Sequence, residues 1–140
     1  MAIILVGGGD LAARLIRSIE DRGGDVALVT LHERDAEEFA LAFPRSVVFN
    51  GDARDPDVLA QAHAGRADAL IAATDDDATN LSTCLLAREV FHIPLVTGLA
   101  RHPQNVRIFE AAGIPCISCS EIVAAGVMTT LTEHPAMAVR

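Results

Sequence analysis

The sequence predicts an α/β fold: a doubly wound, Rossmann-like, six-stranded parallel sheet with helices on both faces, in a single domain. Short apolar runs rich in branched residues alternate along the chain with segments whose apolar residues recur at helical spacing. Continuous apolar runs are typical of parallel strands buried on both faces, and right-handed crossovers then place helices on both sides. With 140 residues, 51 % of them hydrophobic, the chain suffices for one buried core.

The expected strands cover residues 2–6, 26–29, 47–49, 69–72, 95–98 and 114–117. The expected helices are a first one from about 11 to 21, then 33–43, a short one after Asp55 and Pro56, 78–90, one opening at Pro103, and 121–131. An acidic cap followed by proline is a typical helix start. We assign residues 1–131 to the domain and 132–140 to a C-terminal tail.

A glycine turn follows the first strand, in the pattern Gly7-x-Gly9-x-x-Ala12. In a strand, turn and helix context such a pattern predicts a dinucleotide-type fingerprint, in which bare backbone lets a phosphate approach. Ligands of doubly wound sheets bind outside the carboxyl ends of the strands. The expected ligand-facing residues are Gly7, Gly8, Gly9, Asp10, Leu11, Thr30, Leu31, His32, Asp52, Ala53, Ala73, Thr74, Asp75 and Arg101.

The charge composition excludes several functions. A net charge of −8 argues against a nucleic-acid partner, which requires a basic face. All basic residues are arginine, so Schiff-base and P-loop lysine chemistry are excluded.

The chain has no apolar run of bilayer-spanning length and only three cysteines, from which we expect a cytoplasmic protein in a reducing compartment.

Several motifs beyond the glycine turn resemble the regulator of potassium conductance family, that is, the Trk-type N-terminal domain. The resemblance covers residues 1–131 and is carried by Gly51-Asp52-Ala53 with Asp55-Pro56, Ala72 to Asp77 running into Asn80-Leu81, Pro103, and Ala111 to Ile114. It implies a cytoplasmic regulatory domain of a potassium channel, transporter or antiporter. It also implies an adenine nucleotide ligand (AMP, ADP, ATP or NAD(H)) and assembly into dimers or rings, and it implies a sensor rather than an enzyme.

Three residues depart from the family pattern. Asp10 stands where the family usually has arginine, and an ionised aspartate about 4 Å from a phosphate would repel it by ~4 kcal/mol at an effective dielectric of 20. We expect Asp10 to escape by pairing with Arg14, one helical turn on. Thr30 replaces the acid that holds ribose hydroxyls, which would also admit a 2′-phosphate and hence NADP. Leu99 replaces a phosphate-facing arginine, and Arg101 is its expected substitute.

The departures leave other readings open. A degenerate scaffold that keeps the fold for assembly only is one alternative, and a small NAD(P)-dependent oxidoreductase is a weaker one, disfavoured because no substrate domain is visible. No catalytic set can be assembled from the expected loops. We expect no metal site: of Asp75, Asp76 and Asp77, one should cap the following helix and the others be solvated, although an acidic rim with Asp10 and Asp52 could take Mg²⁺ or Ca²⁺.

The final expected helix is the candidate partner surface. Its apolar residues spread wider than one stripe requires, with Gly126 among them. As in the family, we expect this helix to pack on its own copy in a homodimer through Ile122, Val123, Val127, Met128 and Leu131.

Overall fold

The computed structural model describes residues 1–138 and contains one six-stranded sheet, with all strands parallel. The strand order is β3-β2-β1-β4-β5-β6, the order of the Rossmann fold, with the reversal between β1 and β4. The predicted fold class is therefore confirmed. The strands are β1 (Ala2–Gly7), β2 (Asp25–Thr30), β3 (Val47–Asn50), β4 (Ala69–Ala73), β5 (Leu95–Ala100) and β6 (Cys116–Ser118).

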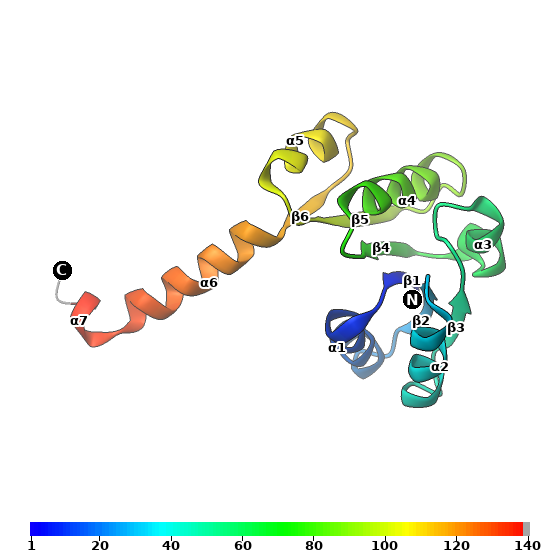
Figure 1. Ribbon diagram of the computed structural model, residues 1–140, viewed down its shortest axis with the longest axis horizontal. Helices are drawn as coiled ribbons and strands as arrows, with labels where there is room; N and C mark the ends of the chain where they lie inside the picture. The colour runs from blue at the N-terminus through cyan, green and yellow to red at the C-terminus, as the bar shows by residue number, and fades with distance from the viewer. Residues whose placement is uncertain (139–140) are drawn as a thin grey trace.

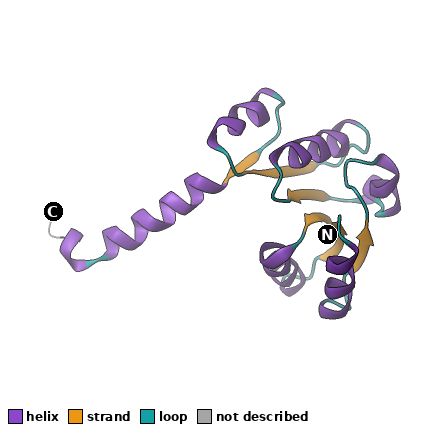
Figure 2. Ribbon diagram, in the orientation of Figure 1, coloured by secondary structure: helices purple, strands orange, loops and turns teal. Residues whose placement is uncertain are grey.

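Helices cover both faces of the sheet (Figures 1 and 2). Helices α1 (Gly9–Asp21) and α2 (Glu33–Ala42) pack on one face, and α3 (Pro56–Gln61), α4 (Asp77–Glu89) and α5 (Pro103–Ala111) pack on the other. A 3-10 turn at Ala64–Arg66 leads into β4, and the chain ends in α6 (Cys119–Glu133) and α7 (Pro135–Ala138). Because all six strands are parallel, their carboxyl ends lie at the same edge of the sheet.

The alternation of side chains along β1 explains the two cores. Ile4 and Val6 point to the face of α3 to α5, and Leu5 points to the face of α1 and α2. All three are at most 3 % exposed. Complete burial of a Leu, Ile or Val side chain contributes about 1.5–3 kcal/mol each, so the opening apolar run anchors both cores.

Most boundaries shift by one or two residues from the sequence prediction, and two of the differences have a clear physical cause. The sixth strand begins at Cys116, because Pro115 has no amide to donate and the amide of Ile114 binds the Phe109 carbonyl at 3.0 Å, closing the end of α5. The Ile114 side chain is nevertheless buried, so it contributes to the core from a loop. In the expected tail, Pro135 opens the short helix α7.

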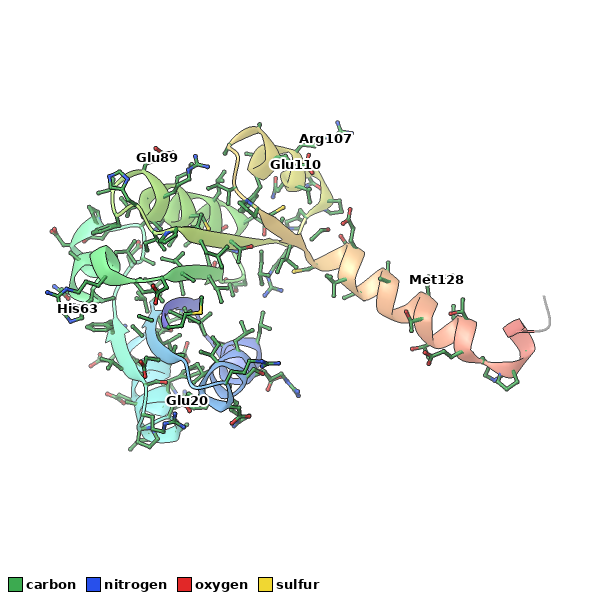
Figure 3. All side chains as sticks on the ribbon, turned by 180° about the vertical axis from the view of Figure 1, so that it is seen from behind. Glu20, His63, Glu89, Arg107, Glu110 and Met128 are labelled. Atoms are coloured by element: carbon green, nitrogen blue, oxygen red, sulfur yellow. The ribbon has the colours of Figure 1, made fainter. Side chains whose placement is uncertain are left out.

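Helix α6 extends away from the α/β body (Figure 1). None of its residues is buried, and its expected partner residues are 46–64 % exposed. Met128 lies on this projecting segment in Figure 3. Across residues 1–138, no helix has the length and apolar character needed to cross a bilayer.

Candidate functional site: a cleft at the carboxyl ends of the strands

The ends of β1, β2, β3 and β4 enclose a cleft of about 340 Å³. This volume lies in the range of small-molecule sites, about 300–1,000 Å³. Of the residues expected to face a ligand, all except Asp10 line the cleft: Gly7, Gly8, Gly9, Leu11, Thr30, Leu31, His32, Asp52, Ala53, Ala73, Thr74, Asp75 and Arg101. The walls also include residues that the sequence analysis did not select, namely Val6, Val29, Asp35, Gly51, Arg54, Asp76 and Thr79.

The glycine turn forms the floor of the cleft and requires glycine at its first position. Gly7 has a φ of +152°, and a Cβ there would lie 2.7 Å from the carbonyl oxygen of Ala73. Gly8 is the N-cap of α1 and has no side chain to bind the first amides of the helix. The N-terminus of α1 therefore presents backbone N–H groups and a positive dipole end to the cleft, which suits an anion.

Asp10 turns out of the cleft, unlike the other members of the glycine turn. Its Oδ2 accepts a hydrogen bond of 2.8 Å from Arg14 Nε, and its side chain is 79 % exposed. The predicted pairing with Arg14 is confirmed, and the hydrogen bond and charge of Arg14 lower the pKa of the Asp10 carboxyl. The Asp10 side chain is therefore not part of the cleft lining.

The end of β2 presents a threonine where a ribose-binding acid would be expected. Thr30 is buried, and its carbonyl accepts hydrogen bonds from the Asn50 side chain at 3.1 Å and from the Gly51 amide at 3.0 Å. These bonds join β2 to the end of β3. Beyond Thr30, Leu31 is 59 % exposed at the cleft, an apolar surface beside the otherwise polar rim.

Asp52 does not face the cleft as a free carboxylate. Arg54 Nε donates to Oδ1 at 3.0 Å and to Oδ2 at 3.2 Å, and Arg54 Nη2 donates to Oδ2 at 2.7 Å. The Arg54 amide also donates to Oδ1 at 2.9 Å. These bonds from Arg54 hold the pKa of Asp52 below its ordinary value. The turn after β3 is therefore fixed by the carboxylate, which also positions a guanidinium on the cleft wall.

A fully buried asparagine fixes the opposite wall. Asn80 Oδ1 accepts from the Thr74 amide at 3.0 Å and from the Thr74 hydroxyl at 2.6 Å. Its Nδ2 donates to the carbonyls of Thr74 at 3.1 Å and Leu99 at 3.0 Å. One side chain thereby ties the loop after β4 to α4 and to β5. Leu99 itself lies within β5 with its side chain buried in the core and does not line the cleft.

The three consecutive aspartates have three different environments. Asp76 caps α4, accepting from the Thr79 amide at 3.0 Å, as expected of one member of the run. Asp75 is exposed at the cleft. The expectation that the remaining two are solvated is wrong for Asp77, which is only 7 % exposed.

Asp77 organises the start of α5. Its Oδ1 accepts from the Arg101 amide at 2.8 Å, and its Oδ2 accepts from the His102 amide at 3.0 Å and from Asn105 Nδ2 at 2.8 Å. Burial alone would raise the pKa of Asp77, but these donors more than compensate and the pKa is lowered. The Arg101 backbone is thereby held where its guanidinium lines the cleft, with Nε 3.4 Å from the Thr74 carbonyl oxygen.

Acidic residues at this edge do not converge on a common centre. Within the described part of the chain, no group of three or more His, Cys, Asp or Glu side chains is arranged to hold a metal ion. The carboxylates of Asp10, Asp52, Asp76 and Asp77 instead bind the donors named above. Backbone amides of the glycine turn and the Arg101 guanidinium are the groups with which the cleft could bind a polar, partly anionic small molecule.

Sheet order, glycine turn and cleft together define a Rossmann-type domain whose cleft lies at the topological switch point of the sheet. The TrkA-N domain profile matches residues 3–120, and the chain belongs to this family. The chain is 30 % identical over 138 residues to the Trk system potassium uptake protein TrkA homolog of Methanothermobacter thermautotrophicus. That match covers 99 % of this chain but 63 % of the relative's length.

Solved structures agree on the fold. The GsuK channel bound to NAD matches with a TM-score of 0.76 at 24 % identity, over 86 % of this chain and 22 % of that one. The Kef CTD of Shewanella denitrificans in its AMP-bound form matches with a TM-score of 0.77 at 19 % identity, over 99 % of this chain and 86 % of that one. At these identities the likeness establishes the fold of the sheet and its helices.

Proposed function

We propose that this chain is a cytoplasmic regulatory domain of a potassium channel, transporter or antiporter, and that it senses an adenine nucleotide in the cleft. The observation that carries the proposal is the open cleft in which the glycine turn, an α1 N-terminus without a side-chain cap and Arg101 face one volume. Membership of the TrkA-N domain family supports the link to potassium transport, since the matched relative is named as a potassium uptake protein. The GsuK channel bound to NAD and the Kef CTD in its AMP-bound form share this fold, which supports the ligand class.

The cleft suggests how such a ligand would lie. Its phosphate would accept hydrogen bonds from the first amides of α1, and Arg101 would approach from the opposite wall. Its base would rest near Leu31 and Ala53, where the wall is apolar. Asp10 does not oppose this pose because Arg14 holds its carboxylate.

The charges on the walls favour a ligand with few phosphates. Asp35, Asp52, Asp75 and Asp76 line the cleft against the guanidiniums of Arg54 and Arg101, and Arg54 is already bound to Asp52. Each further phosphate would add like charge beside these carboxylates. We therefore place a mononucleotide such as AMP ahead of ADP, ATP and the dinucleotides. The same excess of carboxylates favours the alternative, a scaffold that binds no nucleotide.

A sensor, rather than an enzyme, fits the side chains of the cleft. A catalytic assignment needs a nucleophile or base hydrogen-bonded to an orienting partner. Asp52 instead binds Arg54, Asp76 binds the Thr79 amide at the start of α4, and Thr74 is bonded to Asn80. Binding energy would then be used to change the arrangement of neighbouring domains.

Helix α6 is the proposed surface for homodimer formation. Its exposed apolar residues include Val127 and Met128, at 53 % and 52 %, and a shallow hollow beside Gly126 is lined by Val123, Val127, Thr130 and Leu131. Side chains of this size exposed on one helix are typical of an interface with a second copy. In the whole assembly, the dimer would couple cleft occupancy to the membrane partner.

The decisive experiment is isothermal titration of the purified chain with AMP, ADP, ATP, NAD⁺, NADH and NADPH, each with and without Mg²⁺. Micromolar binding of AMP or another adenine nucleotide is the expected result. Asp10→Arg serves as a comparison, which should tighten binding by adding a cation at the glycine turn. Absence of binding by every nucleotide to both proteins would overturn the sensing role and leave the scaffold alternative.

The dimer is tested by light scattering at tens of micromolar. A dimeric mass is expected for the natural sequence and a monomeric mass for Val127→Asp. Leu41→Asp is the matched control because Leu41 is 86 % exposed on α2, away from α6. A monomeric natural chain would contradict the proposal.

A further inference from the structure

The cleft contains an acid that the sequence pattern does not anticipate. Asp35 lies in the first turn of α2, whereas the ribose-binding acid of a dinucleotide site is expected at the end of the second strand, where this chain has Thr30. Both residues line the cleft. The chain has therefore not lost an acid from this corner of the site but carries one five residues later, on the adjoining helix.

The two side chains approach the same point above the glycine turn. The point that a Cβ would occupy on Gly8 lies 3.5 Å from Asp35 Oδ2 and 3.5 Å from Thr30 Oγ1. A carboxylate from α2 and a hydroxyl from β2 thus face the same small volume above bare backbone. A side chain at residue 8 would fill that volume, so glycine leaves it open to a ligand.

The carboxylate of Asp35 is not neutralised by a neighbouring cation. None of the ion pairs found among residues 1–138 includes it, and the adjacent Arg34 instead pairs with Glu38 at 3.5 Å. This distinguishes Asp35 from Asp10 and Asp52, which are each bound by an arginine. An ionised carboxylate with free lone pairs can accept two hydrogen bonds at once, as a pair of vicinal hydroxyls would donate.

We propose that Asp35, assisted by Thr30, binds the ribose 2′- and 3′-hydroxyls of the nucleotide and makes the cleft selective for an unmodified ribose. The inference rests on the proposed function, because it assigns a specificity-determining residue to that site. The selectivity has two physical causes. A 2′-phosphate would bring a dianion against an unpaired carboxylate, which repels it. A 2′-deoxy sugar would leave one carboxylate oxygen without a hydrogen-bond donor. The cleft therefore rejects NADP and its relatives, contrary to what replacement of the strand-end acid by Thr30 alone suggests.

The test compares three ligands on two proteins. AMP, 2′-deoxy-AMP and adenosine 2′,5′-bisphosphate are titrated into the natural chain and into Asp35→Asn. In the natural chain, AMP should bind about 10- to 100-fold more tightly than 2′-deoxy-AMP, the span expected for a hydrogen bond to a charged group. In Asp35→Asn, the affinity for AMP should fall by a similar factor, whereas the affinity for 2′-deoxy-AMP should change much less. The bisphosphate should bind this variant more tightly than it binds the natural chain.

Glu37→Gln is the matched control, since it removes one negative charge from an exposed position of the same helix, outside the cleft. It should leave the preference among the three ligands unchanged, and thermal melting should show that both variants are folded. If AMP binds but Asp35→Asn keeps the full preference for it over the 2′-deoxy analogue, the role of Asp35 is refuted while nucleotide sensing stands. If none of the three ligands, nor any nucleotide of the wider panel, binds the natural chain, both are refuted.

Discussion

The α/β body and helix α6 have comparable apolar content but opposite surroundings. In the body, Ile4, Leu5 and Leu70 are at most 1 % exposed, because helices cover both faces of the sheet. In α6, Ile122 and Val123 are 62 % and 64 % exposed, and no residue of the helix is buried. Apolar residues in the body therefore stabilise the chain's own fold, whereas those of α6 contribute free energy only when another surface covers them.

The largest expected effect comes from the same kind of truncation made in both regions. Leu70→Ala should lower the free energy of unfolding by about 2–5 kcal/mol, because it leaves a cavity in a closed core. Val127→Ala should change the unfolding of the monomer by less than about 0.5 kcal/mol. Denaturant unfolding at low protein concentration measures both. Equal losses would show that α6 packs on its own body in solution.

Glycine-to-alanine substitutions should have opposite signs in the two regions. Gly7→Ala should cost about 2–4 kcal/mol, since it combines a positive φ with a Cβ 2.7 Å from a carbonyl oxygen. A Cβ added at Gly126 would meet no neighbouring atom within 4 Å, so Gly126→Ala should stabilise the monomeric helix by about 0.5–1 kcal/mol. Thermal melting of dilute samples tests the pair. A destabilising Gly126→Ala would indicate that α6 is covered even in the dilute chain.

A smaller effect should depend on pH in the body but not in α6. The folded pKa of Asp77 lies below its ordinary value of about 4, so its stabilisation is present at neutral pH and is lost as the pH falls through the folded pKa. Asp77→Asn should therefore cost about 1–3 kcal/mol at pH 7 and less near pH 3. Glu121→Gln, in the first turn of α6, should cost under about 0.5 kcal/mol at either pH. Urea unfolding at both pH values measures these costs. A cost of Asp77→Asn that does not change with pH would contradict the stabilising role of the ionised Asp77 carboxylate.

Local sequence signals were sufficient for the elements and for most of the cleft. Apolar runs and glycine or proline stops located the first five strands to within two residues. The rule that ligands bind at the carboxyl ends of strands selected residues that do line one cleft. The sixth strand was misplaced because Ile114 is as apolar as a strand residue but is buried from a loop.

The remaining features depend on contacts between distant segments. Nothing in the run of three aspartates distinguishes Asp77, whose burial arises because the start of α5 comes to lie over it. Arg54 was passed over, although its spacing of two from Asp52 after a strand end was a usable signal. Asp35 was not predicted because the dinucleotide pattern places the acid at the strand end, whereas an acid in the first turn of the next helix can reach the same volume.

Asn80 makes half of the cleft behave as one rigid piece. Its amide uses both donors and both acceptors on Thr74 and Leu99, so the ends of β4 and β5 cannot separate without breaking a saturated, buried bond set. Domain motion driven by a ligand must therefore originate across the cleft, at the glycine turn and the end of β2, or in the Arg101 side chain. Among the cleft loops, amide hydrogen exchange should be slowest at Thr74, and that amide should serve as a fixed reference against which movement of the other loops is measured.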